Sequence, residues 1–214
     1  MTEHPSDPLS LRSIRFLLSL PDRLLSRACS LLWARALSVP SPRLHWTSRI
    51  VGVPCIRIGA RFQAGRYLWI EAVQSFNEQH FEPSIVFGDD INVSDLVHIA
   101  AISSVVIGNG VLIGSKVIVT DHNHGVYSGA GEHSSPQERP NRRALAGAPV
   151  RIGDRAFLGD NVVVLPGSTI GEGAIVGANS TVSGEIPPAT IAVGNPARPV
   201  RRYDPVACRW LPLT

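Results

Sequence analysis

The stretch "RIGDRAFLGDNVVVLPGSTIGEGAIVGANSTVSGEI", residues 151–186, returns an aliphatic residue to the same phase every six positions. The anchors of this run are Ile152, Leu158, Val164, Ile170, Val176 and Val182. Neither the 3.6-residue period of a helix nor the two-residue period of a strand explains a period of six. A solenoid explains it: each hexad forms one short strand and one turn, and three hexads close a triangular coil of about eighteen residues.

The same period extends toward the N-terminus. Earlier anchors are Ile58, Ala64, Ile70, Phe87, Val93, Ile99 and Val105 and, after a two-residue slip, Ile107, Ile113 and Val119. Each anchor is expected to point into its coil, and the small residue that often follows it is expected to permit a tight bend. Residues 121–150 interrupt the pattern and are rich in Gly, Ser, Pro and charge, which predicts a loop that leaves the solenoid.

Composition narrows the class of protein. The chain has 214 residues, 44% hydrophobic and 17% charged, which suits a globular domain rather than a disordered chain. The net charge is +3, and no basic cluster has the density of a nucleic-acid groove. The three cysteines form no CxxC pair, so neither a zinc cage nor a disulfide framework is indicated, and a reducing compartment, the cytoplasm, fits best.

The first 49 residues interleave leucines with arginines and predict an amphipathic helical extension, which Pro21 is expected to divide into two helices. Its apolar core "FLLSL", residues 16–20, is too short for a secretory signal, and the arginines interrupt any membrane-spanning helix. Two alternatives stay open. The helices pack on the protein's own core or on another subunit, or they lie on an anionic membrane surface.

Residues 151–203 resemble the C-terminal half of the hexapeptide-repeat acyltransferases. The ending "GEIPPATIAVGNPARPVRR", residues 184–202, resembles the closing turn of the galactoside, maltose and polysaccharide O-acetyltransferases, and "TDHNHGVY", residues 120–127, resembles the branch that acts on O-antigen and exopolysaccharide sugars. The resemblance implies a mainly β fold, a left-handed parallel β-helix of hexapeptide repeats. The β-helix is expected over residues 50–203 with the external loop 121–150, flanked by the extension 1–49 and a C-terminal tail 204–214.

The resemblance also implies an activity: transfer of acetyl from acetyl-CoA, a co-substrate, to a saccharide hydroxyl, without a metal, by a homotrimer. A hydroxyl needs a base to take its proton, and imidazole suits that task near neutral pH. His124 matches the family's catalytic histidine when counted from the preceding anchor, whereas counting from the Val-Thr pair favours His122. We take His124 as the preferred base and His122 as an orienting or sugar-binding group, with Asp121, Asn123 or a backbone carbonyl holding a ring nitrogen.

The remaining site residues follow from the same resemblance. Asn92 and His98 are both expected at coil corners, where the resemblance implies acceptor binding; a plain role in the turn is the alternative. The residues expected to bind the donor are Phe157, Gly159, Asp160, Ala178, Ser183, Arg198 and Arg201, the two arginines by meeting phosphate groups. Two positions depart from the family: Phe157 stands where Trp is frequent, and Gly184 stands where Lys is usual, which puts one phosphate contact in doubt.

Three other functions stay open. One is an acetyltransferase whose acceptor is a small antibiotic. Another is a γ-type carbonic anhydrase with His98, His122 and His124 as zinc ligands, and the third is a non-catalytic assembly module. The preferred acceptor is a surface polysaccharide or its lipid-linked precursor, and the basic N-terminus would then contact the inner face of the membrane from the cytoplasm.

Overall fold

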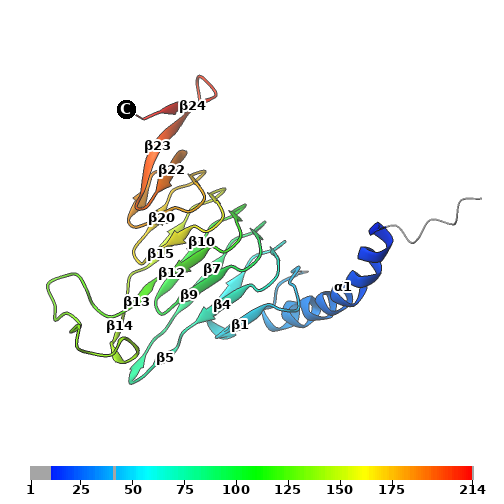
Figure 1. Ribbon diagram of the computed structural model, residues 1–214, viewed down its shortest axis with the longest axis horizontal. Helices are drawn as coiled ribbons and strands as arrows, with labels where there is room; N and C mark the ends of the chain where they lie inside the picture. Colours follow the sequence, from blue (N-terminus) through cyan, green and yellow to red (C-terminus); the bar gives the residue numbers. More distant parts are fainter. Residues whose placement is uncertain (1–10, 41, 214) are drawn as a thin grey trace, which may run out of the picture.

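The computed structural model describes residues 11–40 and 42–213 of the chain, with helix side chains from Leu20 onward. Residues 1–10 of the predicted extension, and the side chains of Arg12 and Arg15, lie outside the described residues. The chain forms a three-sided prism of stacked coils, and one helix, α1 (Leu11–Ala36), extends from its N-terminal end (Figure 1). A mainly β fold with parallel sheets and one N-terminal helix is therefore confirmed.

Each side of the prism is one sheet that takes a strand from successive coils. The first side contains β1 (Arg49–Val51), β4 (Trp69–Ala72), β9 (His98–Ala101), β12 (Ile118–Thr120), β17 (Val163–Val164) and β20 (Thr181–Val182). The second side contains β2 (Ile56–Ile58), β7 (Ser84–Phe87), β10 (Ser104–Ile107), β15 (Val150–Ile152), β18 (Thr169–Ile170) and β21 (Glu185–Ile186). The third side contains β3 (Gln63–Ala64), β8 (Asn92–Val93), β11 (Leu112–Ile113), β16 (Phe157–Leu158), β19 (Ile175–Val176) and β22 (Thr190–Gly194).

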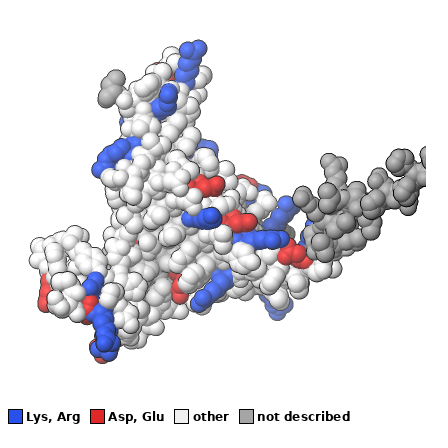
Figure 2. Space-filling model, in the orientation of Figure 1, with Lys and Arg blue, Asp and Glu red and all other residues white. Residues whose placement is uncertain are grey.

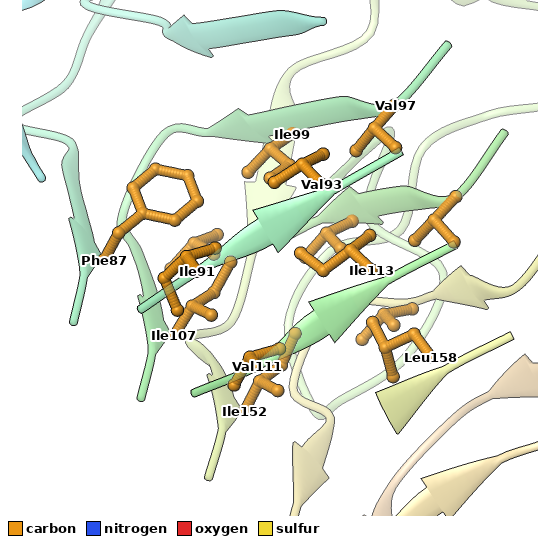
Figure 3. Packing of buried hydrophobic residues seen from close by; sticks show 14 of the residues in the cluster. Phe87, Ile91, Val93, Val97, Ile99, Ile107, Val111, Ile113, Ile152 and Leu158 are labelled. Carbon is orange, nitrogen blue, oxygen red and sulfur yellow. The ribbon is translucent and has the colours of Figure 1, made fainter. Parts of the chain in front are cut away.

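The predicted anchors form the core. Register pairs them coil upon coil, so that Phe87, Ile107 and Ile152 form one column on the second side, while Figure 3 shows neighbouring columns meeting inside the prism. Every anchor from Phe87 to Val182 is at most 6% exposed. The two-residue slip arises because β10 has four residues and buries both Val105 and Ile107. Full burial of one such side chain is worth about 1.5–3 kcal/mol, so the columns are the main source of stability.

The glycines that follow the anchors serve close approach between coils, which corrects the expectation that they permit a bend. A Cβ on Gly108 would lie 2.3 Å from Asp154 Oδ1 and 2.7 Å from Asp154 N in the next coil. The left-handed backbone at the turns belongs instead to residues such as Lys116 and Asn161, with φ of 59° at both. The small residue is therefore needed for the spacing of the stack rather than for the turn.

Two hairpins leave the prism at the edge between its first and second sides. The predicted loop has an antiparallel stem, β13 (His122–His124) with β14 (Leu145–Gly147), and carries a short 3-10 helix, η2 (Pro140–Arg142). A second hairpin, β5 (Ser75–Phe76) with β6 (Gln79–His80), was not predicted. Both project on the same side of the molecule (Figure 1).

The two ends of the prism differ from the sequence-based expectation. α1 is one continuous helix with Pro21 inside it, so the predicted division into two helices is wrong; a proline removes only one backbone hydrogen bond, and the rest of the helix tolerates it. Ser30 Oγ and the backbone of Leu44 exchange hydrogen bonds of 2.9 and 3.0 Å, which dock α1 on the segment that precedes β1. A short 3-10 helix, η1 (Val53–Cys55), joins β1 to β2. No helix in residues 11–40 and 42–213 is long and apolar enough to cross a bilayer.

The expected C-terminal tail is largely structured. β22 continues into β23 (Ala197–Asp204), and β24 (Arg209–Pro212) pairs antiparallel with β23. These strands extend the third side beyond the last coil and cover its open edge, where unpaired backbone groups would otherwise be exposed.

Replacing Gly108 with Ala is expected to lower the free energy of unfolding by about 1–3 kcal/mol, because the added methyl group would overlap the next coil. Gly131→Ala is the matched control, since nothing lies within 4 Å of its Cβ and its φ is not left-handed, and it should change stability by less than about 0.5 kcal/mol. Urea unfolding measures both. Equal stability of the two variants would contradict the close-approach explanation.

Candidate active site

Asp121 is the first residue after β12, and its side chain is fully buried. Its Oδ1 accepts a hydrogen bond from Ile102 N at 2.9 Å, and its Oδ2 accepts bonds from Ser103 N and Ser104 N at 2.7 and 2.8 Å. These three amides form the corner of the preceding coil. Because a buried carboxylate is costly unless its lone pairs are used, this corner holds Asp121 in one position.

The imidazole of His122 lies against this carboxylate, with Nδ1 2.9 Å from Asp121 Oδ1. Since an ionised carboxylate only accepts, Nδ1 carries the proton in this pair and Nε2 of the neutral ring keeps its lone pair. The His122 side chain is 12% exposed, so the ring is largely sheltered from water. His122 therefore has the arrangement of a general base oriented by a carboxylate.

His124, the base favoured from the sequence, has a different environment. Its ring is exposed and meets the edge of Phe76 at a centroid distance of 5.0 Å and an angle of 81°. Side chains alternate along β13, so both histidines lie on one face of the strand and Asn123 lies on the other. Of the two residues proposed to hold a ring nitrogen, Asp121 does so and Asn123 does not.

His98 lies at the start of β9 and stacks on Trp69, with ring centroids 4.1 Å apart and an angle of 16°. Trp69 Nε1 and His98 Nε2 are both buried without a hydrogen-bond partner among the described residues. Burial lowers the pKa of His98 from 6.5; Glu71 opposes this shift, and His122 adds to it.

Asn92 does not share this environment. It is exposed on the third side, between Gln63 and Leu112 in register, whereas His98 lies on the first side between Trp69 and Ile118. Within one chain the structure therefore does not bring the two proposed acceptor-binding residues together.

A cleft of about 820 Å³ lies between the two hairpins. Gln79 fixes one side of it, since its side chain accepts from Leu145 N at 2.7 Å and donates to Leu145 O at 3.2 Å. Glu78 lines the same side, and Glu138 and Arg142 line the other. Sequence analysis did not identify Phe76 and Gln79 as site residues. The interruption of the six-residue period between Ile70 and Phe87 was the feature that could have indicated a hairpin there.

The proposed donor residues divide between two edges of the first side. Gly159, Asp160 and Ala178 follow β16 and β19 at the edge with the third side, where Asp160 Oδ1 accepts from Ser115 N at 2.7 Å. Ser183 follows β20 at the edge from which the histidine hairpin leaves. Ala178 and Ser183 are both exposed.

Phe157 and the terminal arginines belong to the third side. Phe157 is 38% exposed and points outward from β16. Arg198 and Arg201 are exposed on β23, where each guanidinium bonds a backbone carbonyl: Ala197 O at 3.1 Å and Trp210 O at 3.3 Å. Gly184 has φ of 107°, a left-handed backbone that a lysine there would adopt only with strain.

Within the described part of one chain, no three His, Cys, Asp or Glu side chains gather as a group that could hold a metal ion. His98, His122 and His124 face Trp69, Asp121 and Phe76, respectively.

Comparison with known proteins identifies the family. The profile of the bacterial transferase hexapeptide family (six repeats) matches residues 149–184. WbbJ of Escherichia coli K12, provisionally named a lipopolysaccharide biosynthesis O-acetyl transferase, is 42% identical over 169 residues, which cover 76% of this chain and 83% of WbbJ. The chain belongs to the hexapeptide-repeat transferase family. The resemblance found in the sequence is confirmed, and this hexapeptide-repeat transferase is an acyltransferase.

Two solved structures share the fold of this hexapeptide-repeat transferase. A hexapeptide-repeat containing acetyltransferase of Vibrio cholerae, in complex with acetyl coenzyme A, has a TM-score of 0.52 and 21% identity over 94% of each chain. AntD, an N-acyltransferase of Bacillus cereus in complex with dTDP and 3-hydroxybutyryl-CoA, has a TM-score of 0.53 and 19% identity over 73% of this chain and 77% of AntD.

The lowered pKa of His98 predicts a pH-dependent stability. The folded state favours the neutral imidazole, so this contribution is complete above the ordinary pKa of 6.5 and is lost as the pH falls below it. His98→Phe keeps an aromatic ring on Trp69 and removes the titration. Between about pH 7.5 and pH 5.5, its free energy of unfolding should fall less than that of the parent protein in urea titrations. An equal fall in both proteins would exclude His98 as the responsible group.

Proposed function

We propose that this acyltransferase is an O-acetyltransferase that moves acetyl from acetyl-CoA to a hydroxyl of a surface polysaccharide or of its lipid-linked precursor. The observation that carries the proposal is the pair formed by Asp121 and His122 at a prism edge, where the hairpin begins whose outer part lines the polar cleft. The name of WbbJ supports both the acetyl group and the class of acceptor.

His122 is the base in this proposal, in preference to His124. Its Nε2 takes the proton of the acceptor hydroxyl while the oxygen attacks the thioester carbonyl carbon. The carbon–sulfur bond then breaks, the sulfur leaves as thiolate, and His122 returns the proton to it, giving an ester and CoA. Asp121 stabilises the imidazolium between these steps. General-base help of this kind is worth about 10²–10⁴-fold in rate.

The acceptor is proposed to lie against the two hairpins. A saccharide offers hydroxyl donors and acceptors, and the cleft supplies Glu78, Glu138 and Arg142 as partners. His124 and Phe76 lie on the hairpins that bound the cleft and would orient the sugar, with residues 134–140 as part of a lid. His98 and Asn123 remain proposed contacts, and Asn92 would take part only from a neighbouring subunit.

The finer features of the assembly belong to the same proposal. The prism of residues 50–203 is a left-handed β-helix, with the extension 1–49 and the segment 204–214 as appendages. Three copies associate in the cytoplasm, and acetyl-CoA lies in the groove between neighbours. Gly159, Asp160, Ala178, Ser183 and Phe157 line that groove, and Arg198 and Arg201 meet the phosphates, since guanidinium forks match phosphate oxygens.

His122→Ala is expected to lower kcat for acetyl transfer by about 10²–10⁴-fold, because the oriented base is lost. His124→Ala is the matched control on the same strand face and should lower kcat by less than about tenfold while raising KM for the acceptor. Thiol release from acetyl-CoA with polysaccharide fragments measures both. A larger kcat loss in His124→Ala than in His122→Ala would reverse the assignment, and full activity of both variants would refute the mechanism.

A further inference from the structure

One face of α1 carries side chains that contact the prism. Asp22 Oδ1 accepts hydrogen bonds from His45 Nε2 at 2.9 Å and Trp46 Nε1 at 2.6 Å, and Asp22 Oδ2 accepts one from Arg66 at 2.7 Å. Ser30 is bonded to Leu44 one step further along, and Trp33 packs on the core. At 100° per residue these three helix residues fall within an arc of about 80°. This arc is the docked face of α1, and it fixes the rotation of the helix.

The opposite face of α1 is rich in leucine side chains that the described residues leave exposed. At the same angular spacing, five leucines fall within an arc of about 140°: Leu20, Leu24, Leu25, Leu31 and Leu32. Leu24, Leu31 and Leu32 are 67%, 68% and 72% exposed. A row of exposed leucines of this kind marks an interaction surface, and we call it the leucine face. Figure 1 shows α1 extending outward from the prism.

Charge decides between a membrane and a second copy of the chain as the occupant. Residues 11–66 contain ten of the twenty Lys and Arg residues but only one, Asp22, of the seventeen acidic residues. Figure 2 shows basic side chains around the junction of α1 with the first coils. Two copies joined through α1 would bring these positive segments together, at an electrostatic cost. An anionic lipid surface instead attracts them.

The arginines of α1 are placed for lipid headgroups. Arg35 lies within the arc of the leucine face and Arg27 lies at its border, and both are exposed. A groove of about 540 Å³ between α1 and the first coil is lined by Arg27 and Arg43 together with Leu31. Long arginine side chains can bury their methylene groups beside leucines and keep the guanidinium at the level of the phosphates.

We propose that the leucine face is a docking surface for an anionic phospholipid bilayer, with α1 lying in the membrane interface. The Asp22 contacts would fix the orientation of the prism relative to the docked helix. An amphipathic helix binds in this way through buried apolar area together with attraction to anionic headgroups. Docking would bring the enzyme close to a lipid-linked acceptor, a consequence that rests on the proposed function. The proposal concerns only where the enzyme resides and needs neither His122 nor any donor-binding residue.

The test is sedimentation of the full-length protein with vesicles of phosphatidylcholine alone and of phosphatidylcholine with phosphatidylglycerol. The protein should bind the anionic vesicles, and high salt should weaken that binding by screening. The triple variant Leu24→Ser/Leu31→Ser/Leu32→Ser should lower partition by about tenfold or more. Val206→Ser, at a residue 94% exposed on the β23–β24 turn, is the matched control and should bind as the parent does.

Other outcomes would overturn the proposal. Unchanged vesicle binding of the triple variant would show that the leucine face does not bind the membrane. A change of oligomeric state in sedimentation velocity, without loss of vesicle binding, would assign the face to a second copy. Arg27→Gln/Arg35→Gln, which leaves the leucines intact, should weaken binding to anionic vesicles alone, and equal binding would also refute the proposal. Activity on a soluble saccharide should be unchanged in all these variants, so loss of docking and failure of the proposed chemistry are distinguishable.

Discussion

The carboxylate of Asp121 connects the backbone of the solenoid to the side chain of the proposed base. It accepts the backbone N–H groups of Ile102, Ser103 and Ser104, which the corner of the preceding coil would otherwise leave without partners, and it also holds Nδ1 of His122. These bonds hold the buried carboxylate in one position on the coil. The imidazole of His122, bonded to the same carboxylate, is thereby fixed relative to the coil. The proposed base, although it lies on an external hairpin, is thus positioned by the solenoid.

This arrangement depends on the aliphatic columns beneath it. Anchors such as Ile99 and Val119 are fully buried and pair in register, so β9 and β12 cannot slip relative to each other. A shift by one residue would turn the anchors outward and carry Asp121 away from its three amides. The stack thereby sets the geometry of the proposed base, while two hairpins and a polar cleft extend from the edge between the first and second sides. Helix α1, at the N-terminal end of the prism, takes no part in this site and is proposed to dock on a membrane.

The sequence predicted the parts of the structure that repeat. The hexad period predicted the anchors and the loop at residues 121–150, because a solenoid is the fold that buries an aliphatic residue at every sixth position. It failed where a single residue was taken as decisive: Pro21 does not break α1, and the glycines serve spacing rather than bending. It also missed the β5–β6 hairpin. The choice between His122 and His124 was open because only the fold shows which ring the buried carboxylate reaches.

Nitrogen-15 NMR of the His122 ring, at a pH where the imidazole is neutral, measures the central contact directly. We expect a protonated Nδ1 and an unprotonated Nε2, with this tautomer lost in Asp121→Asn, while His124 shows no dependence on that substitution. A neutral His122 that carries its proton on Nε2 in the parent protein would contradict the account, because the nitrogen assigned to take the acceptor's proton would already hold one.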